Sequence, residues 1–334
     1  MHKIIQFILG IFLLSFAQDT CAQTPYSSQN FNLNNFFNPA TSGFGINNKV
    51  QTLFRTQYEG VGSAYRTIGI AADLALLRKN SYDKNNLFGF GVQAVSEQVL
   101  DGVLQTNAVS LSLANRLFLN EAKTSSIALG ISSTLITRTI DASKLTFGDQ
   151  FNSGRLFNAT SLEVVNAIPS KFSSNVGLLY TLSNEQTFFQ FGGSLFYINR
   201  SATEQALGKF EESYQTLAQI NFEKKIWENN TIAFHADYQN RFENEFFYTG
   251  AVFSIPMNSR GENFDRFYIG CFYRTKDATI PYVGLMYNKY KFGLSYDIYQ
   301  SNMTMSTLRP QTFEFTISTN ISNRVSDKLV SLFN

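Results

Sequence analysis

The stretch that most constrains the fold lies near the end of the chain, where apolar and polar residues alternate over 289–299. Because successive side chains of a β-strand point to opposite sides, one face of this segment would carry Tyr290, Phe292, Leu294, Tyr296 and Ile298. The other face would carry Lys289, Lys291, Gly293, Ser295, Asp297 and Tyr299. Such a pattern fits a soluble sheet with one wet face, and equally a membrane barrel with lipid outside and water inside.

Segments with the length and composition of strands recur from residue 49 onward. At 49–58, for example, Val50, Phe54 and Tyr58 share one face, while Arg55 lies on the opposite, polar face. No helical period competes with this pattern over a useful length. We expect fourteen strands, at 49–58, 64–76, 87–97, 103–118, 125–138, 171–182, 187–199, 212–224, 230–240, 245–256, 265–275, 279–287, 289–299 and 311–321.

A barrel accounts for these segments better than a sandwich does. A soluble sandwich turns its apolar faces inward and needs only seven to nine strands in roughly 100 residues. Charged residues make up only 16% of this chain and aromatic residues 15%, against roughly 25% charged in ordinary globular proteins. Aromatic residues near segment ends, such as Tyr58, Tyr238, Tyr290 and Tyr296, suit the interfacial girdles of an outer-membrane barrel. The prediction is an all-β, antiparallel outer-membrane β-barrel of about fourteen strands.

The lengths of the connections provide a second line of support. The three longest gaps, at about 139–170, 200–211 and 300–310, all follow odd-numbered strands. Outer-membrane barrels have short periplasmic turns and longer extracellular loops. We therefore expect both chain termini in the periplasm and the three long gaps outside the cell. Gaps of middling length near 77–86 and 257–264 fall at the other end, so the rule holds for the longest loops only.

The ends of the chain differ in composition from the predicted barrel at 48–322. Residues 1–22 have the basic start, apolar core and small-residue cleavage site of a secretory signal peptide. Acylation of Cys21 is the alternative, but the residues before it make a poor approach to a lipoprotein cysteine. Residues 23–47, rich in Asn, Ser and Gly, are predicted to form an extended leader, and residues 323–334 a C-terminal tail.

Little in the sequence supports catalysis or cofactor binding. His235 is the only histidine after the signal peptide, so a cluster of histidines around a metal is not available. An outer-membrane hydrolase could pair His235 with Asp237, yet no GxSxG-type elbow occurs. Gly89 and Gly91 lie on a predicted strand without a following helix, which favours close packing over a nucleotide loop. We predict no catalytic residue, metal or cofactor, and the absence of a basic run argues against nucleic acid.

Several motifs resemble one family. They are FFNPATSG (36–43), TRTIDASKLTFGDQFN (137–152), FFQFGGSLFYINR (188–200), FYRTKDATIPYVGLMY (272–287), GLSYDIYQSNM (293–303) and FEFTIS (313–318). In order and spacing the set resembles the PorP/SprF family of type IX secretion system membrane proteins, over essentially the whole mature chain. The chain departs from the family pattern in its TPYSSQNF opening, in Tyr58 where Trp is common, and in the tail after the last strand.

The resemblance implies an outer-membrane barrel without catalytic function. Members of the family are linked to the secretion or surface attachment of large adhesins, often through a C-terminal domain of the cargo, and to gliding. The partners implied are such an adhesin, other type IX secretion subunits and outer-membrane lipid. We expect the interaction surface in the leader and in two long loops, with candidate residues Phe37, Asn38, Pro39, Phe147, Asp149, Gln150, Phe151, Ser301, Asn302 and Met303.

Other functions remain open at this level. A passive porin or small-solute channel is the main alternative, although a fourteen-strand barrel is narrower than the 16–18-strand porins that leave an open channel. An outer-membrane hydrolase and a soluble secreted β-protein are the other two. Asn38 and Pro39 also suit a simple turn, and Asp149 and Gln150 suit a loop closed by side-chain hydrogen bonds.

Overall fold

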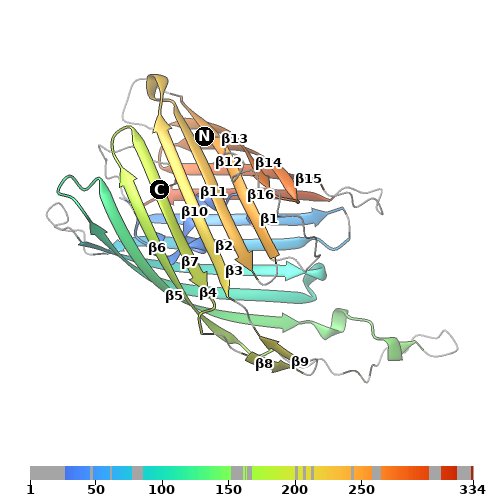
Figure 1. Ribbon diagram of the computed structural model, residues 1–334. Coiled ribbons are helices and arrows are strands. Elements are labelled where there is room, and N and C mark those ends of the chain that lie inside the picture. The colour runs from blue at the N-terminus through green and yellow to red at the C-terminus, as the bar shows by residue number, and fades with distance from the viewer. Residues whose placement is uncertain are drawn as a thin grey trace, which may run out of the picture.

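A computed structural model describes residues 27–45, 48–60, 62–76, 86–151, 161, 163, 168–199, 202–205, 208–211, 214–241, 244–257, 265–300, 310–321 and 332–333. Fourteen strands of this part of the chain close into an antiparallel barrel (Figure 1). They are β1 (Lys49–Glu59), β2 (Tyr65–Leu76), β3 (Asn86–Val99), β4 (Leu104–Phe118), β5 (Ser125–Ile140), β6 (Lys171–Ser183), β7 (Thr187–Phe196), β10 (Gln215–Lys225), β11 (Thr231–Arg241), β12 (Asn244–Pro256), β13 (Arg266–Arg274), β14 (Ala278–Tyr287), β15 (Tyr290–Tyr299) and β16 (Gln311–Asn320).

The predicted fold and its strands are confirmed. The largest boundary differences are at the end of β7, predicted at 199 and observed at 196, and at the start of β10, predicted at 212 and observed at 215. Each strand pairs with its neighbour in sequence, and β1 pairs with β16 to close the barrel. Of the helices in the described residues, none is long and apolar enough to cross a membrane.

The polar face of the strands points into the barrel. In β1, Gln51, Arg55 and Gln57 are buried, whereas Phe54 between them is 45% exposed on the outer surface. In β15, Ser295 and Asp297 are buried while Leu294 and Ile298 are exposed. The outer surface is consequently apolar, and the polar side chains line the lumen, as the alternation predicts for a membrane barrel.

One aromatic side chain departs from this alternation. Tyr58 was expected on the outer face with Phe54, and this was wrong. The register of β1 against β16 shifts between Thr56 and Glu59, and Tyr58 adopts a left-handed conformation (φ 60°) there. Its ring packs against Tyr65 and Tyr299, with centroids 5.6 and 5.4 Å away. The irregularity re-aims the side chain, as β-bulges commonly do.

The two ends of the barrel are different. We call the end where β1 begins and β16 ends the terminal mouth, and the opposite end the loop mouth. Strands β5, β7 and β15, which precede the three longest gaps, all end at the loop mouth (Figure 1). The wall is tallest beside the first of these, because β5 has 16 residues and β4 has 15, against 9 in β13.

Between β7 and β10 the chain forms a hairpin that was not predicted. Its strands, β8 (Ala202–Gln205) and β9 (Gly208–Glu211), pair with each other in a two-stranded sheet separate from the barrel. In Figure 1 this hairpin lies at the loop mouth, beyond the ends of the barrel strands. The sequence predicts no strand within 200–211, and each strand of the hairpin has only four residues.

The N-terminal segment lies inside the barrel, and we call its residues 27–44 the plug. It consists of three short helical turns, η1 (Asn30–Asn32), α2 (Asn34–Phe37) and η2 (Pro39–Thr41), rather than the extended leader that was expected. Most of the plug is buried, including Phe31, Leu33 and Ala40 at no more than 1% exposure. The lumen is therefore filled by the protein's own chain.

Candidate functional site in the barrel lumen

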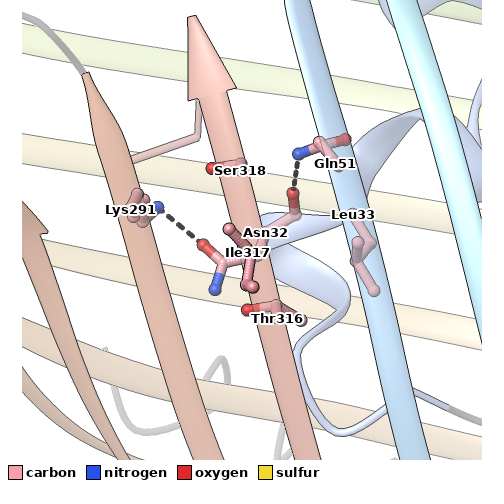
Figure 2. A pocket seen from close by; sticks show the side chains of 7 residues that line it. All are labelled: Asn32, Leu33, Gln51, Lys291, Thr316, Ile317 and Ser318. Carbon is pink, nitrogen blue, oxygen red and sulfur yellow. Dashed lines mark hydrogen bonds between the residues drawn. The ribbon is translucent and has the colours of Figure 1, made fainter.

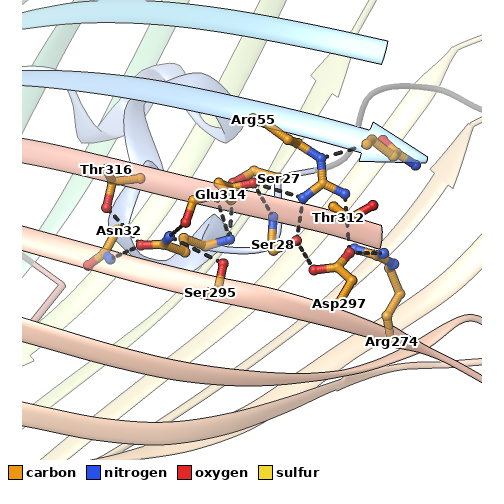
Figure 3. Close-up of polar contacts among 12 residues, drawn as sticks. Ser27, Ser28, Asn32, Arg55, Arg274, Ser295, Asp297, Thr312, Glu314 and Thr316 are labelled. Carbon is orange, nitrogen blue, oxygen red and sulfur yellow. Dashed lines mark hydrogen bonds and ion pairs between the residues drawn. The ribbon is translucent and has the colours of Figure 1, made fainter. Parts of the chain in front are cut away.

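The plug begins at the seam where the barrel closes. In the register of β1 and β16, Arg55 lies directly opposite Glu314, and the Arg55 guanidinium is 3.0 Å from the Glu314 carboxylate. The same carboxylate accepts hydrogen bonds from the Ser27 hydroxyl (2.6 Å) and from the backbone N–H groups of Ser28 (2.7 Å) and Gln29 (2.9 Å). One buried carboxylate thus joins the first strand, the last strand and the plug (Figure 3).

A second carboxylate extends this cluster. Asp297 on β15 lies 3.2 Å from Arg55 and 2.8 Å from Arg274, and it accepts a hydrogen bond of 2.5 Å from the Ser28 hydroxyl. The two guanidinium groups match the two carboxylates in charge. All four charged side chains are almost fully buried. Removing one member of such a buried pair costs about 3–5 kcal/mol, because a charge is then left unpaired.

Inward polar side chains complete the hydrogen bonding of the plug backbone. Short helical turns leave carbonyl groups without internal partners, and buried carbonyl groups need a donor. Four wall residues supply one each: Tyr248 to Ser28 O (2.7 Å), Gln51 to Asn32 O (2.6 Å), Gln93 to Asn35 O (2.6 Å) and Ser194 to Phe37 O (2.6 Å). The polar lumen is therefore complementary to one backbone segment.

An aromatic cluster anchors the first turn of the plug. The Phe31 ring stacks on Phe272 with centroids 4.5 Å apart and meets the edge of Tyr282 at 5.0 Å. Tyr248 stacks on Phe272 in turn, at 5.2 Å. Both faces of β14 are apolar, because Ala278, Ile280 and Tyr282 point inward to this cluster, while Val283 and Leu285 are exposed on the outer face. Burial of the Phe31 ring therefore stabilises the docked plug by the hydrophobic effect, in addition to the polar contacts.

Glycines in the wall make room for the second half of the plug. A Cβ atom at Gly89, Gly130 or Gly177 would collide with plug residues 38–43. The plug backbone therefore lies directly against strands β3, β5 and β6. The prediction that Gly89 serves close packing is confirmed, and its neighbour is the plug. The next contact toward β1 is a hydrogen bond from the Gly43 N–H to the buried carboxylate of Asp73.

A small cavity remains beside the plug near the terminal mouth (Figure 2). It is lined by Asn32, Leu33, Gln51, Lys291, Thr316, Ile317 and Ser318. Its size is roughly that of a single water molecule. The Lys291 ammonium donates to the Asn32 side-chain oxygen at 2.6 Å on one side of it. The cavity is too small for a substrate.

The C-terminal end of the chain also enters the lumen. Leu332 and Phe333 are both 4% exposed and belong to the same apolar cluster as Phe31. The Phe333 ring stacks near Phe188 of β7, with centroids 6.1 Å apart. Most of the predicted tail, 323–331 and 334, lies outside the described residues.

The side chain of His235 is buried in the lumen. Its Nε2 atom is 2.9 Å from Asp237, and its Nδ1 atom is 2.5 Å from the side chain of Asn221, its cross-strand partner. Asp237 in turn accepts a hydrogen bond from Asn30 of the plug (3.2 Å). Within the described residues, no group of three or more His, Cys, Asp or Glu side chains could hold a metal ion.

The loop after β5 is the described part of the loop mouth that extends furthest from the barrel (Figure 1). It holds two short turns, η5 (Ala142–Lys144) and η6 (Gly148–Gln150). At the start of the first turn, a hydrogen bond from the Ser143 hydroxyl holds the pKa of the exposed Asp141 below its usual value. The pair between Asp141 and Lys144, at 3.7 Å, is solvent-exposed and contributes little.

The candidate partner-binding residues are distributed over different environments. Asn38 and Pro39 are buried in the lumen, where Asn38 caps η2 by accepting from the Ala40 N–H at 2.9 Å, and Phe37 beside them is half-buried. In the β5 loop, Asp149 is exposed and Phe151 is 60% exposed. Phe147 there is half-buried, and Gln150 is buried with its side chain accepting from the Phe147 N–H at 2.8 Å. Ser301, Asn302 and Met303 lie outside the described residues.

The sequence reading missed the residues that hold the plug. Arg55 and Asp297 belong to predicted polar faces, but the ion pairs of Arg55 with Asp297 and Glu314 were not predicted. Charged side chains on inward faces, in a chain with only 16% charged residues, were the available signal. The apolar inward face of β14 was the second signal, since it requires an apolar partner inside the barrel.

These features define the class of the protein: a closed outer-membrane β-barrel whose polar lumen is filled by the N-terminal segment of its own chain. Within that class, the chain belongs to the family of the type IX secretion system membrane protein PorP/SprF, whose model matches residues 20–319. It is thus an outer-membrane barrel of a protein secretion system.

Other comparisons add less. No curated protein matches the chain in sequence. Among solved structures, a FadL homologue of Pseudomonas aeruginosa aligns with a TM-score of 0.46 and 8% identity over 85% of this chain and 93% of that one. The Pseudomonas putida toluene transporter TodX aligns at 0.45 and 9% identity, over 86% and 93%. BamA of Haemophilus ducreyi aligns at 0.41 and 9% identity, over 82% and 70%.

Proposed function

We propose that this protein is a non-enzymatic component of the type IX secretion system that binds a large surface adhesin and helps to export or anchor it, in support of gliding. Residues 1–22 would be removed as a signal peptide. The strand ends at the terminal mouth would face the periplasm, and the strand ends at the loop mouth would face the cell exterior. Other secretion subunits are the second class of partner, and outer-membrane lipid surrounds the apolar outer face.

The observation that carries this proposal is the filled lumen in a member of a secretion family. The plug is held by buried ion pairs at the seam, by Phe31 in its aromatic cluster and by wall donors to its carbonyl groups. An open solute channel has no need of a wall matched so closely to an internal segment. A closed barrel that presents loops to a protein partner fits these contacts better than a passive porin does.

The surface proposed for the adhesin is the loop mouth. Phe151 and Asp149 in the β5 loop are exposed beside the tallest part of the wall, and Ser301, Asn302 and Met303 belong to the long connection after β15. Asn38 and Pro39 are buried, so they would reach a partner only if the plug left the lumen. Phe147, Gln150 and Phe37 would act in support, by shaping the loop and the plug.

The test is a mild-detergent pull-down of the tagged protein from native outer membranes, followed by mass spectrometry. We expect a large surface protein to be recovered with the wild-type barrel, and its yield to fall with Phe151→Ala. Trp227→Ala is the matched control, because Trp227 is also an exposed aromatic residue (76%) but lies in the turn between β10 and β11 at the terminal mouth.

Two outcomes would contradict the proposal. Recovery of the barrel alone at several detergent strengths would favour the channel alternative. Loss of the surface protein with Trp227→Ala, but not with Phe151→Ala, would place its docking surface at the wrong mouth.

A further inference from the structure

The clearest unassigned site in the molecule lies in the lumen at the terminal mouth, where Leu332 and Phe333 sit. Three backbone polar groups of this dipeptide have specific partners. The Leu332 N–H donates to the Glu223 carboxylate at 2.7 Å. The Leu332 carbonyl accepts from the Lys291 ammonium at 2.9 Å, and the Phe333 carbonyl accepts from the Asn34 amide at 2.9 Å. One acceptor (Glu223) and two donors (Lys291 and Asn34) therefore form hydrogen bonds with one stretch of peptide backbone.

Side-chain recognition accompanies the backbone contacts. The Phe333 ring lies between Phe188, with ring centroids 6.1 Å apart, and His235, at 6.2 Å. Leu332 packs in the same buried cluster as Phe31 and Tyr268. The two residues therefore fill an apolar pocket that selects an aliphatic side chain followed by an aromatic one. Backbone contacts that provide affinity, with pockets that provide specificity, are how peptides are commonly recognised.

The site is built into the barrel wall and is close to its opening. Lys291 is the second residue of β15, Phe188 is the second residue of β7, and Glu223 is the third from the end of β10. All three positions are at the terminal mouth. Glu223 is 2% exposed and Asn34 is 8% exposed. Removal of the dipeptide would take a hydrogen bond from the buried Glu223 carboxylate and from the buried Asn34 amide. The loss of a hydrogen bond by a buried polar group costs free energy.

One wall of the site belongs to the plug. Asn34 is the first residue of α2, and the Lys291 ammonium bridges the Leu332 carbonyl and the side chain of Asn32. Occupancy of the site therefore adds contacts to the plug, and release of the dipeptide removes them. This arrangement couples the C-terminal residues to the stability of the plug.

We propose that Glu223, Lys291 and Asn34, together with the Phe188 ring, form a peptide-binding site for an aliphatic–aromatic dipeptide. The protein's own Leu332 and Phe333 occupy this site in cis and lock the plug in the lumen. A separate peptide of the same chemistry binds there when the chain's own residues are removed from it. The site is independent of the loop-mouth surface proposed above for the adhesin.

The test uses the full-length protein in detergent and a fluorescent synthetic peptide with the sequence of residues 326–334, SDKLVSLFN. In one variant, Leu332→Ser with Phe333→Ser vacates the site without shortening the chain. We expect the peptide to bind this variant at least tenfold more tightly than the wild type, whose site is filled. A peptide carrying the Phe333→Ala change should bind the vacated variant at least tenfold more weakly, because it lacks the aromatic ring.

Two further variants locate the binding. Glu223→Gln in the vacated protein removes the charged acceptor of the Leu332 N–H and should weaken peptide binding about tenfold or more. If that variant does not fold, Asn34→Ala tests the same site from the plug side. A lipid-facing substitution, Phe54→Ala, is the control and should leave peptide binding unchanged, since Phe54 faces outward.

A second measurement reports on the lock itself. Hydrogen exchange of the plug amides should be faster in the vacated variant than in the wild type, and addition of the peptide should restore slow exchange. Equal peptide binding by wild type and vacated variant would overturn the proposal. So would a vacated variant that binds no peptide, or one whose plug exchanges at the wild-type rate.

Discussion

Phe31→Ala tests whether the plug is held by packing inside the barrel. Phe31 is fully buried, stacked on Phe272 at 4.5 Å and against the edge of Tyr282 at 5.0 Å. Truncation of a buried Phe to Ala typically costs about 3–5 kcal/mol, from lost transfer energy and the cavity left behind. At 1.4 kcal/mol per factor of ten, the population with the plug released should rise roughly 100-fold to several thousand-fold.

The assay is hydrogen exchange measured by mass spectrometry on peptides that cover residues 27–45. Their protection should fall by the same factor, up to the limit set by the docking free energy of the plug, while protection of the strands stays the same. Phe31→Leu keeps part of the apolar volume and should lie in between. The control, Phe54→Ala, removes a ring from the outer face and should have no effect on the plug. Plug protection within about threefold of wild type in Phe31→Ala would refute the reasoning.

Three other predictions follow from the same contacts. Gly177→Leu places a side chain where Asn38 and Pro39 lie and should accelerate hydrogen exchange of the plug amides at least tenfold. Leu178→Phe, on the outer face, should not change the exchange rate. Equal rates in the two variants would show that the close approach of the plug to Gly177 is unimportant. Arg55→Met leaves the buried Glu314 carboxylate without its ion pair, whereas Asp297 keeps Arg274. It should lower the free energy of unfolding by about 3–5 kcal/mol in urea titrations, with part of the loss recovered by adding Glu314→Gln. Cys271, exposed on the outer face, should react in membranes with a lipid-soluble maleimide but not with a charged one; rapid labelling by the charged reagent would place it in water.

The sequence was informative about the barrel because strand faces are encoded locally. Alternation along 289–299 is enough to assign which side chains face outward, and Leu294 and Asp297 occupy the faces predicted for them. A one-residue error in register would have moved the apolar residues into the lumen, so the pattern is strongly constrained. Tyr58 is the exception, because a bulge changes the direction of its side chain without a clear mark in the sequence.

The plug was not predictable from the same kind of evidence. An Asn- and Ser-rich segment usually indicates a loop. No pattern in residues 27–44 indicates that their contacts are with residues distant in the sequence. Ser27 and Glu314, which share a hydrogen bond, are 287 residues apart in the chain. The pairing arises only after the barrel closes and brings β1 and β16 together. The docking of Phe333 beside Phe188 is equally nonlocal.

The candidate partner-binding residues were predicted from motifs, and they lie in different environments of the structure. The FFNPATSG motif falls in the plug, where its Asn38 and Pro39 contact the barrel wall. The sequence of this motif is therefore explained by folding of the barrel itself. Phe151 is exposed and remains a candidate for recognition of a partner.

Single-channel conductance of the purified full-length protein in a planar bilayer tests the central claim most directly. A barrel closed by its own plug should show no steady pore, and Phe31→Ala or Gly177→Leu should produce openings that are absent from Phe54→Ala. A large, steady conductance from the wild-type protein would contradict a plugged secretion component and would favour a passive outer-membrane channel.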